Sequence, residues 1–511
     1  MWYHAKQNQK SKGGGKVKYH STRSKEAYFD SRDAILKGLC DDGGLFVTDD
    51  MDGERLDPGA LIDKGYRELA FDIMKRFLSD MDEKSLKDAI ASAYDDKFAS
   101  RLITPVTPLG NDWLLELYHG PTCAFKDVAL CMLPRLMSIA LKDRDEKLMI
   151  VTATSGDTGK AALEGFRDAS GIAITVFYPY QKVSDIQYLQ MATQEGNNTF
   201  VGAVRGNFDD CQTEVKKIFS SDIVSELEGS GVYLSSANSI NIGRLIPQIV
   251  YYADAYRQLM ARGELLPGDP VDFCVPTGNF GDVLAGYIAK RMGLPVRKLI
   301  VASNENNVLT DFLTTGVYDR RREFKKTISP SMDILVSSNL ERMLYYESGG
   351  DCELTAGLMK DLSEKGYFRI SDEMLSGIRE SFDCGYASDD EAREAIRASY
   401  ESYDRVVDPH TAVAIKVAED CRRRGAAGDC PMVILSTASP YKFASDVYGS
   451  IFGGGAVSGQ EAMALLYERT GEPIPKSLRD LQKKPILHKE VLDIREMKGF
   501  VYDNVRRSLL L

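Results

Sequence analysis

Long hydrophobic runs, paired cysteines and clustered histidines are all missing from this 511-residue chain. The most apolar helical segment, 128–141, is interrupted by Arg135, so no stretch is long enough to span a bilayer and we expect no membrane partner. The nine cysteines are scattered without a C-x-x-C pair, which predicts reduced thiols and a cytoplasmic protein. The five histidines are too dispersed for a metal site, so we expect no bound metal.

Positive charge is also in short supply, because 75 acidic residues outnumber 64 basic ones and give a formal net charge of −11. A nucleic-acid-binding protein usually presents a basic face, so we expect no nucleic-acid partner. Hydrophobic residues make up 43% of the chain, which is typical of a globular protein, and the length allows more than one domain. The polar segment 1–16 contains three consecutive glycines and is expected to be a flexible leader outside the fold.

A single lysine in an apolar setting is the most informative local feature. The segment 117–127 reads LYHGPTCAFKD and places Lys126 shortly after a Gly-Pro turn. Burial lowers the pKa of a lysine and favours the neutral amine that attacks carbonyl groups, so Lys126 is a candidate Schiff-base lysine. A lysine that reaches solvent or pairs with Asp127 would give the same sequence pattern.

Two glycine-rich loops follow apolar strand candidates and lead into helical patterns. The first, 152–159, reads TATSGDTG, and the second, 276–282, reads PTGNFGD. Free N–H groups at a helix start bind anions, and glycine lets backbone amides approach a ligand closely. The first loop departs from the P-loop pattern at Thr154 and Ala161. Together with the apolar lysine, the two loops suggest a phosphorylated aldehyde cofactor and a second anionic ligand.

With these segments in place, the chain resembles the threonine synthase family, in its longer form with an added N-terminal region. Further matching segments are spread over nearly the whole chain: YHSTR at 19–23, DGGLF at 42–46, GNFDDCQ at 206–212, SANSIN at 236–241, SPSMDI at 329–334 and DPHTA at 408–412. The resemblance implies pyridoxal 5'-phosphate (PLP) as cofactor. It also implies the α/β architecture of PLP fold type II, with two parallel-sheet domains, the cofactor between them and an α-rich N-terminal region.

The order of helical and strand patterns divides the chain further. Helical patterns dominate 17–102, and apolar strand candidates alternate with helices from 103 onward. We expect one α/β domain at 103–255, with the lysine and the first loop. A second, at 256–511, would contain the other loop and a helical insertion near 316–403.

The resemblance also implies roles for residues around the cofactor. Lys126 would bind PLP covalently and move protons during the reaction. Thr437 would hydrogen-bond the pyridine nitrogen, although a buried threonine at a strand end would look the same. Amides of the second loop would bind the PLP phosphate, with the Asp282 side chain capping the helix. The residues of this loop are Gly278, Asn279, Phe280, Gly281 and Asp282.

The remaining candidates would face the substrate. Arg244 would bind a substrate phosphate, because a guanidinium stays charged and forms two parallel bonds to it; a surface arginine on a helix is the alternative. Lys182 is a second, weaker candidate for that phosphate. The other positions that the resemblance places at the substrate are Ser155, Gly156, Asp157, Thr158, Ser236 and Asn238.

The implied activity is conversion of O-phospho-L-homoserine and water to L-threonine and phosphate, with this small molecule as the partner of a monomer or homodimer. Four positions depart from the usual family pattern. Ser439 replaces a histidine, Tyr441 a small residue, Ser235 an asparagine and Asp185 a proline. These departures leave open a related phospho-lyase that releases a 2-oxo acid, ammonia and phosphate. A non-catalytic PLP-binding regulator is the other alternative.

Overall fold

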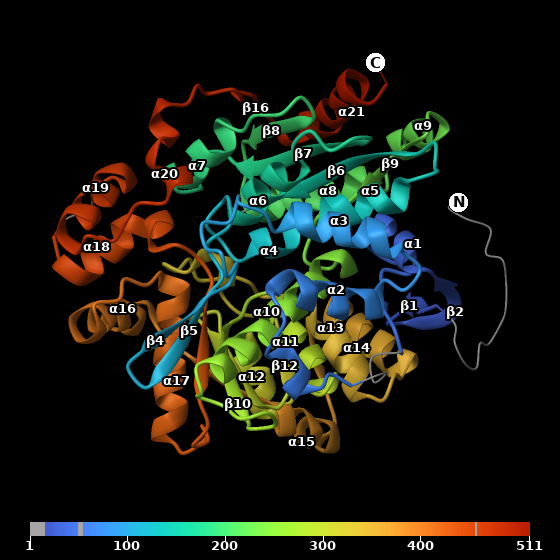
Figure 1. The fold of residues 1–511 in the computed structure, drawn as a ribbon. Helices are drawn as coiled ribbons and strands as arrows, with labels where there is room; N and C mark the ends of the chain where they lie inside the picture. The colour runs from blue at the N-terminus through green and yellow to red at the C-terminus, as the bar shows by residue number, and fades with distance from the viewer. Residues whose placement is uncertain (1–15, 50–54, 155, 455–456, 511) are drawn as a thin grey trace.

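Two largely parallel β-sheets, one in each half of the molecule, organise the chain (Figure 1). The computed structural model describes residues 16–49, 55–154, 156–454 and 457–510. The leader expected at 1–16 therefore lies outside the described residues except for its last position. The two sheets with their covering helices match the expected PLP fold type II, so the predicted fold class is confirmed.

The first sheet has five parallel strands and lies in the upper half of Figure 1. In spatial order they are β16 (Val491–Leu492), β8 (Thr199–Val204), β7 (Ile172–Pro179), β6 (Lys147–Ala153) and β9 (Val232–Ser235). All eight residues of β7 are buried, as expected for a central parallel strand covered on both faces. The helices of this half are α5 (Leu133–Leu141), α6 (Asp157–Phe166), α7 (Asp185–Ala192), α8 (Phe208–Ile218), α9 (Ile223–Gly229) and α21 (Met497–Ser508).

The second sheet has six strands and is parallel except for one edge strand. In spatial order they are β14 (Phe382–Tyr386), β11 (Val296–Ser303), β10 (Val271–Pro276), β15 (Met432–Ser436), β5 (Asp112–Glu116) and β4 (Val106–Leu109). Its helices include α11 (Gly281–Arg291), α12 (Val308–Thr315), α15 (Asp372–Ser381), α16 (Asp389–Tyr403) and α17 (Pro409–Arg423). The C-terminal part adds α18 (Ala444–Phe452), α19 (Gly459–Thr470) and α20 (Lys476–Arg479).

The two sheets exchange segments across the expected domain boundaries. β4 and β5 come from the region 103–255 but pair in the second sheet, whereas β16 from the C-terminal region pairs with β8 in the first. The expected insertion 316–403 is largely helical, with α13 (Leu340–Glu347) and α14 (Cys352–Glu364), and also supplies β14. It includes a small antiparallel pair, β12 (Val317–Asp319) with β13 (Tyr367–Arg369). The boundaries at 103–255 and 256–511 thus do not coincide with the sheets.

The N-terminal region contains helices and one small sheet. Its helices are α1 (Ser31–Lys37), α2 (Tyr66–Phe77) and α3 (Glu83–Ala93). The sheet is antiparallel and consists of β2 (Ser24–Phe29), β1 (Tyr19–Ser21) and β3 (Phe46–Val47). Within the described residues, none of the helices combines the length and the apolar character that crossing a bilayer requires.

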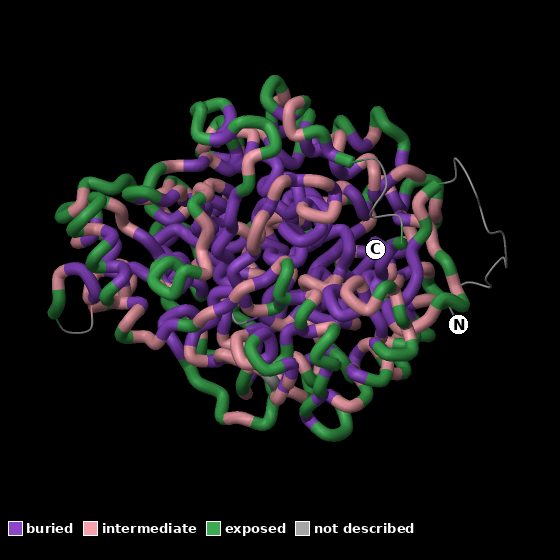
Figure 2. The backbone as a smooth tube through the Cα atoms, turned by 90° about the horizontal axis from the view of Figure 1, so that it is seen from below, coloured by how far each residue is buried: buried purple, intermediate pink, exposed green. Residues whose placement is uncertain are grey.

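Helix α10 (Ile242–Ala261) packs against α2, α4 (Lys126–Leu130) and α11 in the interior. Nearly all of its residues are buried, so it is covered on every side, unlike a surface helix. Figure 2 shows how burial is distributed over the described residues, with buried segments through the centre and exposed segments along the periphery. α4 and the loops that follow β6, β10 and β15 meet in this interior, at the carboxyl ends of the strands, where α/β proteins bind ligands.

Candidate active site

Lys126 is the first residue of α4 and points into the protein, with its side chain 11% exposed. Its Nζ lies 3.2 Å from the Ser331 hydroxyl and 3.9 Å from a carboxylate oxygen of Asp157. Burial lowers the pKa of Lys126 to about 8, so a larger fraction of the amine is neutral near physiological pH than in an exposed lysine. The Asp127 carboxylate accepts hydrogen bonds from Thr122 instead, so neither alternative for this lysine holds.

The segment that carries the lysine is attached to the end of β15. The Phe125 amide donates to the Thr437 carbonyl at 2.8 Å, and Ala124 forms an isolated bridge with Ala438. The Thr437 side chain is buried, yet its hydroxyl has no hydrogen-bond partner among the described residues. Lys126 and the predicted ring-nitrogen ligand are therefore held on adjacent backbone, and the Thr437 hydroxyl is free to donate to a ligand.

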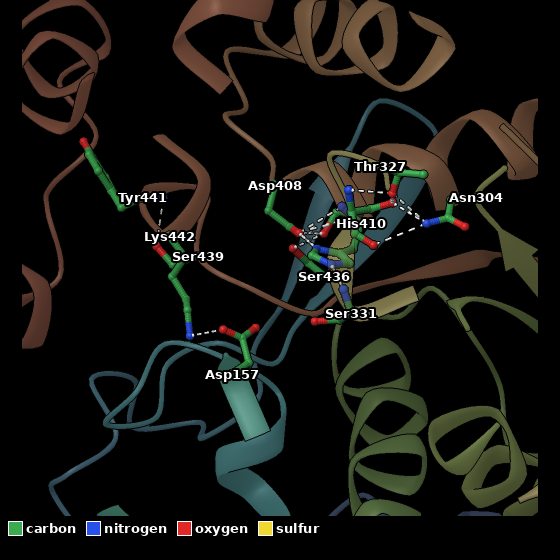
Figure 3. A network of polar contacts seen from close by, with 12 residues as sticks. Asp157, Asn304, Thr327, Ser331, Asp408, His410, Ser436, Ser439, Tyr441 and Lys442 are labelled. Atoms are coloured by element: carbon green, nitrogen blue, oxygen red, sulfur yellow. Dashed lines mark hydrogen bonds and ion pairs between the residues drawn. The ribbon is translucent and has the colours of Figure 1, made fainter. Parts of the chain in front are cut away.

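Asp157 lies between two lysines. Lys442 is fully buried, and its Nζ lies 2.7 Å from Asp157 and donates to the Thr122 carbonyl at 3.0 Å (Figure 3). Burial opposes ionisation of Asp157, but the ammonium groups of Lys442 and Lys126 outweigh it and hold its pKa well below the ordinary value. The carboxylate is therefore charged, and it compensates the buried charge of Lys442.

The first glycine-rich loop is held by side chains on both sides. The Thr154 hydroxyl accepts from the amides of Gly156 and Gly159, each at 2.9 Å. Gly156 has φ of +147°, and a Cβ there would lie 2.3 Å from the Gln187 amide group, so only glycine fits. Gln187 in turn donates to Asp157 at 3.0 Å. These contacts fix the orientation of the first turn of α6 relative to Lys126.

The structure gives few contacts for three of the candidates on the substrate side, which are Thr158, Ser155 and Lys182. Thr158 is partly buried at the start of α6, and Ser155 lies outside the described residues. Lys182 is exposed in the connection between β7 and α7, and its side chain forms no hydrogen bond or ion pair with the described residues. The structure therefore does not bring Lys182 into contact with the other candidates.

The second glycine-rich loop connects β10 to α11. Phe280 has a positive φ of 61° and directly precedes the helix. A Cβ at Gly278 would lie 2.7 Å from the Ser331 carbonyl oxygen, so glycine is needed there for close backbone approach. The first-turn amides of Gly281 and Asp282 have no acceptor within the described part of the chain. Such amides at a helix N-terminus fit the phosphate group of PLP.

The expectation that Asp282 caps α11 is wrong. Its carboxylate points toward α10 and accepts from the hydroxyls of Tyr251 at 2.6 Å and Tyr252 at 2.9 Å. Burial raises the pKa of Asp282 to about 6 despite these two hydrogen bonds. The tyrosines attract the side chain away from the helix start, which leaves only the backbone of Asp282 available to an anion.

Arg244, in the first turn of α10, is a buried cation, not the surface arginine of the alternative. It is 3% exposed, and one guanidinium nitrogen, Nη1, donates to the Ala237 carbonyl at 3.0 Å. Its Nε is buried without a hydrogen-bond partner, and no carboxylate pairs with it among the described residues. Burial lowers the pKa of Arg244 to about 10, and its charge contributes to the lowered pKa of Lys126. An anionic ligand near Lys126 would satisfy this cation.

Ser236 and Asn238 precede α10 and lie at the end of the first sheet. The Asn238 side chain accepts from the Thr152 hydroxyl of β6 at 2.9 Å, and the backbone amide of Asn238 donates to the Ser236 hydroxyl at 3.2 Å. These bonds place the segment 236–241 beside the first glycine-rich loop. Both residues are half-buried and available to a ligand.

The departures from the family pattern have local structural roles. Tyr441 is buried, its hydroxyl donates to the Glu472 carbonyl, and its ring points away from Asp157 (Figure 3). Ser439 accepts from the Tyr441 amide at the start of a short 3-10 helix. Ser235 donates to the Leu36 carbonyl of α1 at 2.7 Å, and Asp185 is exposed at the start of α7.

The assembled residues fit PLP. A partly neutral buried lysine, free amides at the start of α11 and an unpartnered hydroxyl at Thr437 match an aldehyde, a phosphate and a ring nitrogen. In the described part of the chain, no three His, Cys, Asp or Glu side chains come together as a metal site. Our assignment from sequence missed Lys442, Ser331 and His410, although each lies in a segment that matched the family.

Family profiles cover most of the chain. "Threonine synthase N terminus" matches residues 18–94, "Pyridoxal-phosphate dependent enzyme" matches 104–357 and "Threonine synthase, C-terminal" matches 411–501. The threonine synthase of Pseudomonas aeruginosa is 40% identical over 430 residues, which cover 84% of this chain and 89% of that protein.

Two further comparisons describe the architecture. The solved PLP-bound threonine synthase of Brucella melitensis has a TM-score of 0.85 at 37% identity and covers 96% of this chain and 100% of its own. Human threonine synthase-like 1 is 42% identical over 426 residues, which cover 81% of this chain. The match spans only 56% of that longer protein. By sequence and by structure, this chain belongs to the threonine synthase family of PLP-dependent enzymes.

Proposed function

We propose that the protein converts O-phospho-L-homoserine and water to L-threonine and phosphate. The observation that carries this proposal is the presence of two separate places for an anion near Lys126. One is the start of α11, whose amides suit the cofactor phosphate, and the other is buried Arg244 with its unpartnered Nε. An enzyme that handled only the cofactor phosphate would not need the second cation, because burying it without a partner costs stability.

In this proposal each residue acts on a specific atom. Bound PLP supplies an electron sink that stabilises negative charge on the substrate carbons. The Lys126 amine, with its pKa near 8, takes a proton from the α carbon and moves protons at the β carbon. The Thr437 hydroxyl donates to the ring nitrogen, which leaves that nitrogen unprotonated.

The remaining residues orient the substrate and the loops. The guanidinium of Arg244 binds the substrate phosphate and holds it for departure from the γ carbon, after which water adds at the β carbon. Asp157, fixed by Lys442 and Gln187, keeps the first loop against the substrate. Ser236 and Asn238 contact the substrate from the neighbouring segment. Ser155, Gly156 and Thr158 are proposed substrate contacts from that loop.

We also propose that the protein is located in the cytoplasm. All nine cysteines are free thiols, and most are buried, which supports a reducing compartment such as the cytoplasm. Localisation of the tagged full chain by microscopy, with fractionation as a second readout, tests this part. Accumulation of the protein in an oxidising compartment would contradict it.

Product analysis tests the activity. Purified protein loaded with PLP is incubated with O-phospho-L-homoserine, and threonine, phosphate, 2-oxobutyrate and ammonia are measured. Equal amounts of threonine and phosphate are expected. Phosphate with 2-oxobutyrate and ammonia would replace the proposal by a phospho-lyase, and a loaded protein without turnover would leave a PLP-binding regulator.

A further inference from the structure

The Asp408 carboxylate, at the start of α17, receives hydrogen bonds from two side chains that lead in different directions. One oxygen lies 2.6 Å from His410 Nδ1, and the other accepts from the Thr411 hydroxyl (Figure 3). The backbone amides of His410 and Thr411 also donate to it, at 3.0 and 3.3 Å. Asp408 is fully buried, and no lysine or arginine forms an ion pair with it in the described part of the chain.

Two series of hydrogen bonds, called arms below, start at Asp408. The first arm leads from Asp408 to Lys126. The Ser331 amide donates to His410 Nε2 at 3.1 Å, so this nitrogen carries no proton and accepts with its lone pair. The proton of the neutral imidazole is therefore on Nδ1, where it donates to Asp408. The Ser331 hydroxyl in turn accepts from Lys126 Nζ at 3.2 Å. One carboxylate thus sets the histidine tautomer that holds the serine next to the lysine.

The second arm leads from Asp408 to Thr437. A carboxylate can only accept, so the Thr411 hydroxyl donates its single proton to Asp408. The Ser436 hydroxyl, 3.1 Å from Thr411, must then be the donor in that contact. Ser436 is the last residue of β15 and directly precedes Thr437, the proposed ligand of the ring nitrogen.

We propose that Asp408 is a positioning residue that fixes the lysine side and the ring-nitrogen side of the cofactor site at the same time. It acts through two chains, one through His410 and Ser331 to Lys126 and one through Thr411 and Ser436 to Thr437. This inference rests on the proposed cofactor contacts of Lys126 and Thr437. It assigns no direct cofactor contact to Asp408.

An ordinary helix cap would explain only part of this arrangement. Asp408 is the N-cap of α17, and an asparagine caps a helix about equally well. However, four donors converge on the Asp408 carboxylate, and an asparagine would present an NH₂ group to some of them. If the NH₂ faces His410, the imidazole must move its proton to Nε2, toward the Ser331 amide. If it faces Thr411, the Thr411 hydroxyl must accept from it, and Ser436 is then no longer fixed as the donor to Thr411.

Four substitutions and one control separate a positioning role from a role in stability alone. Asp408→Asn keeps the cap but disturbs one arm, Thr411→Val removes the hydroxyl of the second arm, and Thr411→Ser restores it. His410→Asn keeps a donor for Asp408 but no longer reaches the Ser331 amide. Asp272→Asn is the matched control, because Asp272 is equally buried and bonded to Arg297 near the opposite end of β10.

The measurements use the full chain loaded with PLP: the visible absorption spectrum, the Kd for PLP, kcat and KM, and thermal unfolding of the PLP-free form. We expect Asp408→Asn, His410→Asn and Thr411→Val to shift the spectrum and to lower kcat or PLP affinity by about 10-fold or more, as loss of supporting contacts does at metal sites. Thr411→Ser should behave like the unmodified protein. Asp272→Asn should lower thermal stability and leave the spectrum unchanged.

The inference is overturned if these variants lose only thermal stability, as the Asp272 control does, while spectrum and PLP affinity stay unchanged. It is also overturned if Thr411→Val and Thr411→Ser are indistinguishable. Should Asp408→Asn fail to fold, the Thr411 pair still decides the second arm. Spectrum and Kd do not need the substrate, so they separate a failure of this inference from a failure of the proposed activity.

Discussion

Lys442 and Asp157 form an ion pair of 2.7 Å in the protein interior, between residues that are 0% and 3% exposed in their side chains. The pair joins the C-terminal segment after β15 to the loop after β6, and thus connects the two sheets beside Lys126. Removing one partner of a buried pair leaves an uncompensated charge, which is far more destabilising than the loss of an exposed pair.

Lys442→Met should therefore lower the free energy of unfolding by about 3–5 kcal/mol. The double variant Lys442→Met with Asp157→Asn should recover part of this loss, because no buried charge is then unpaired. Denaturant unfolding of the PLP-free protein measures both. Exposed Lys483, which pairs with Asp480, provides the control, and its substitution should change stability by less than about 1 kcal/mol. A double variant no more stable than Lys442→Met would contradict the account.

The pKa of Lys126 predicts how stability depends on pH. Burial lowers this pKa from 10.5 to about 8, so between these values the unfolded chain binds the proton and the folded chain does not. The folded state is consequently penalised below about pH 8, and the penalty fades as the pH rises toward 10.5. In PLP-free protein, Lys126→Met should gain stability relative to the unmodified chain at pH 7 and lose most of that advantage by pH 10. An advantage that is constant with pH would show that Lys126 does not titrate in this range.

Arg244→Met should stabilise the PLP-free protein while weakening substrate binding. The substitution removes a buried guanidinium whose Nε lacks a partner, a defect that costs about 1–3 kcal/mol. We expect a higher KM for phosphorylated substrate and an unchanged PLP spectrum. Arg342→Met is the matched control, since Arg342 is equally buried but donates to the Phe46 and Ile240 carbonyls and to Asn339, and its loss should destabilise. Destabilisation by both variants would argue for a structural role of Arg244.

Gly278→Ala should weaken PLP binding by about 10-fold, which corresponds to about 1.4 kcal/mol. Its Cβ would lie 2.7 Å from the Ser331 carbonyl, so either the phosphate loop or the serine beside Lys126 must move. Gly357→Ala in α14 is the control, because open space surrounds that position and alanine favours the helix. Fluorescence titration with PLP measures both, and equal affinities would contradict the proposed phosphate loop.

Much of the fold was predictable from local patterns. The helical patterns expected within 17–102 correspond to α1, α2 and α3, and strands alternate with helices from 103 onward as expected. The N-terminal sheet was missed because its strands are short and one of them has no buried residue, so no clear alternation is visible. The two residues of β16 give no signal on their own, because their pairing depends on β8, far away in sequence.

Some residues of the candidate site were also predictable from local patterns, and others were not. Lys126 and the two glycine-rich loops have local signatures, because each combines a strand end with a turn and a helix start. Their roles remain predictions. The contacts of Ser331 and Lys442 depend on packing between segments that are 205 and 320 residues apart, which no local pattern records. Asp282 shows the same limit, since only the packing of α10 against α11 reveals the two tyrosines that draw its side chain away.

The most direct test of the proposed reaction is conversion of O-phospho-L-homoserine in water labelled with oxygen-18, followed by mass spectrometry of the products. We expect label in the threonine hydroxyl and none in the released phosphate, because phosphate departs with its bridging oxygen and water adds at carbon. Lys126→Ala should form neither product. Label in the phosphate, with homoserine as the other product, would show hydrolysis at phosphorus and contradict the account.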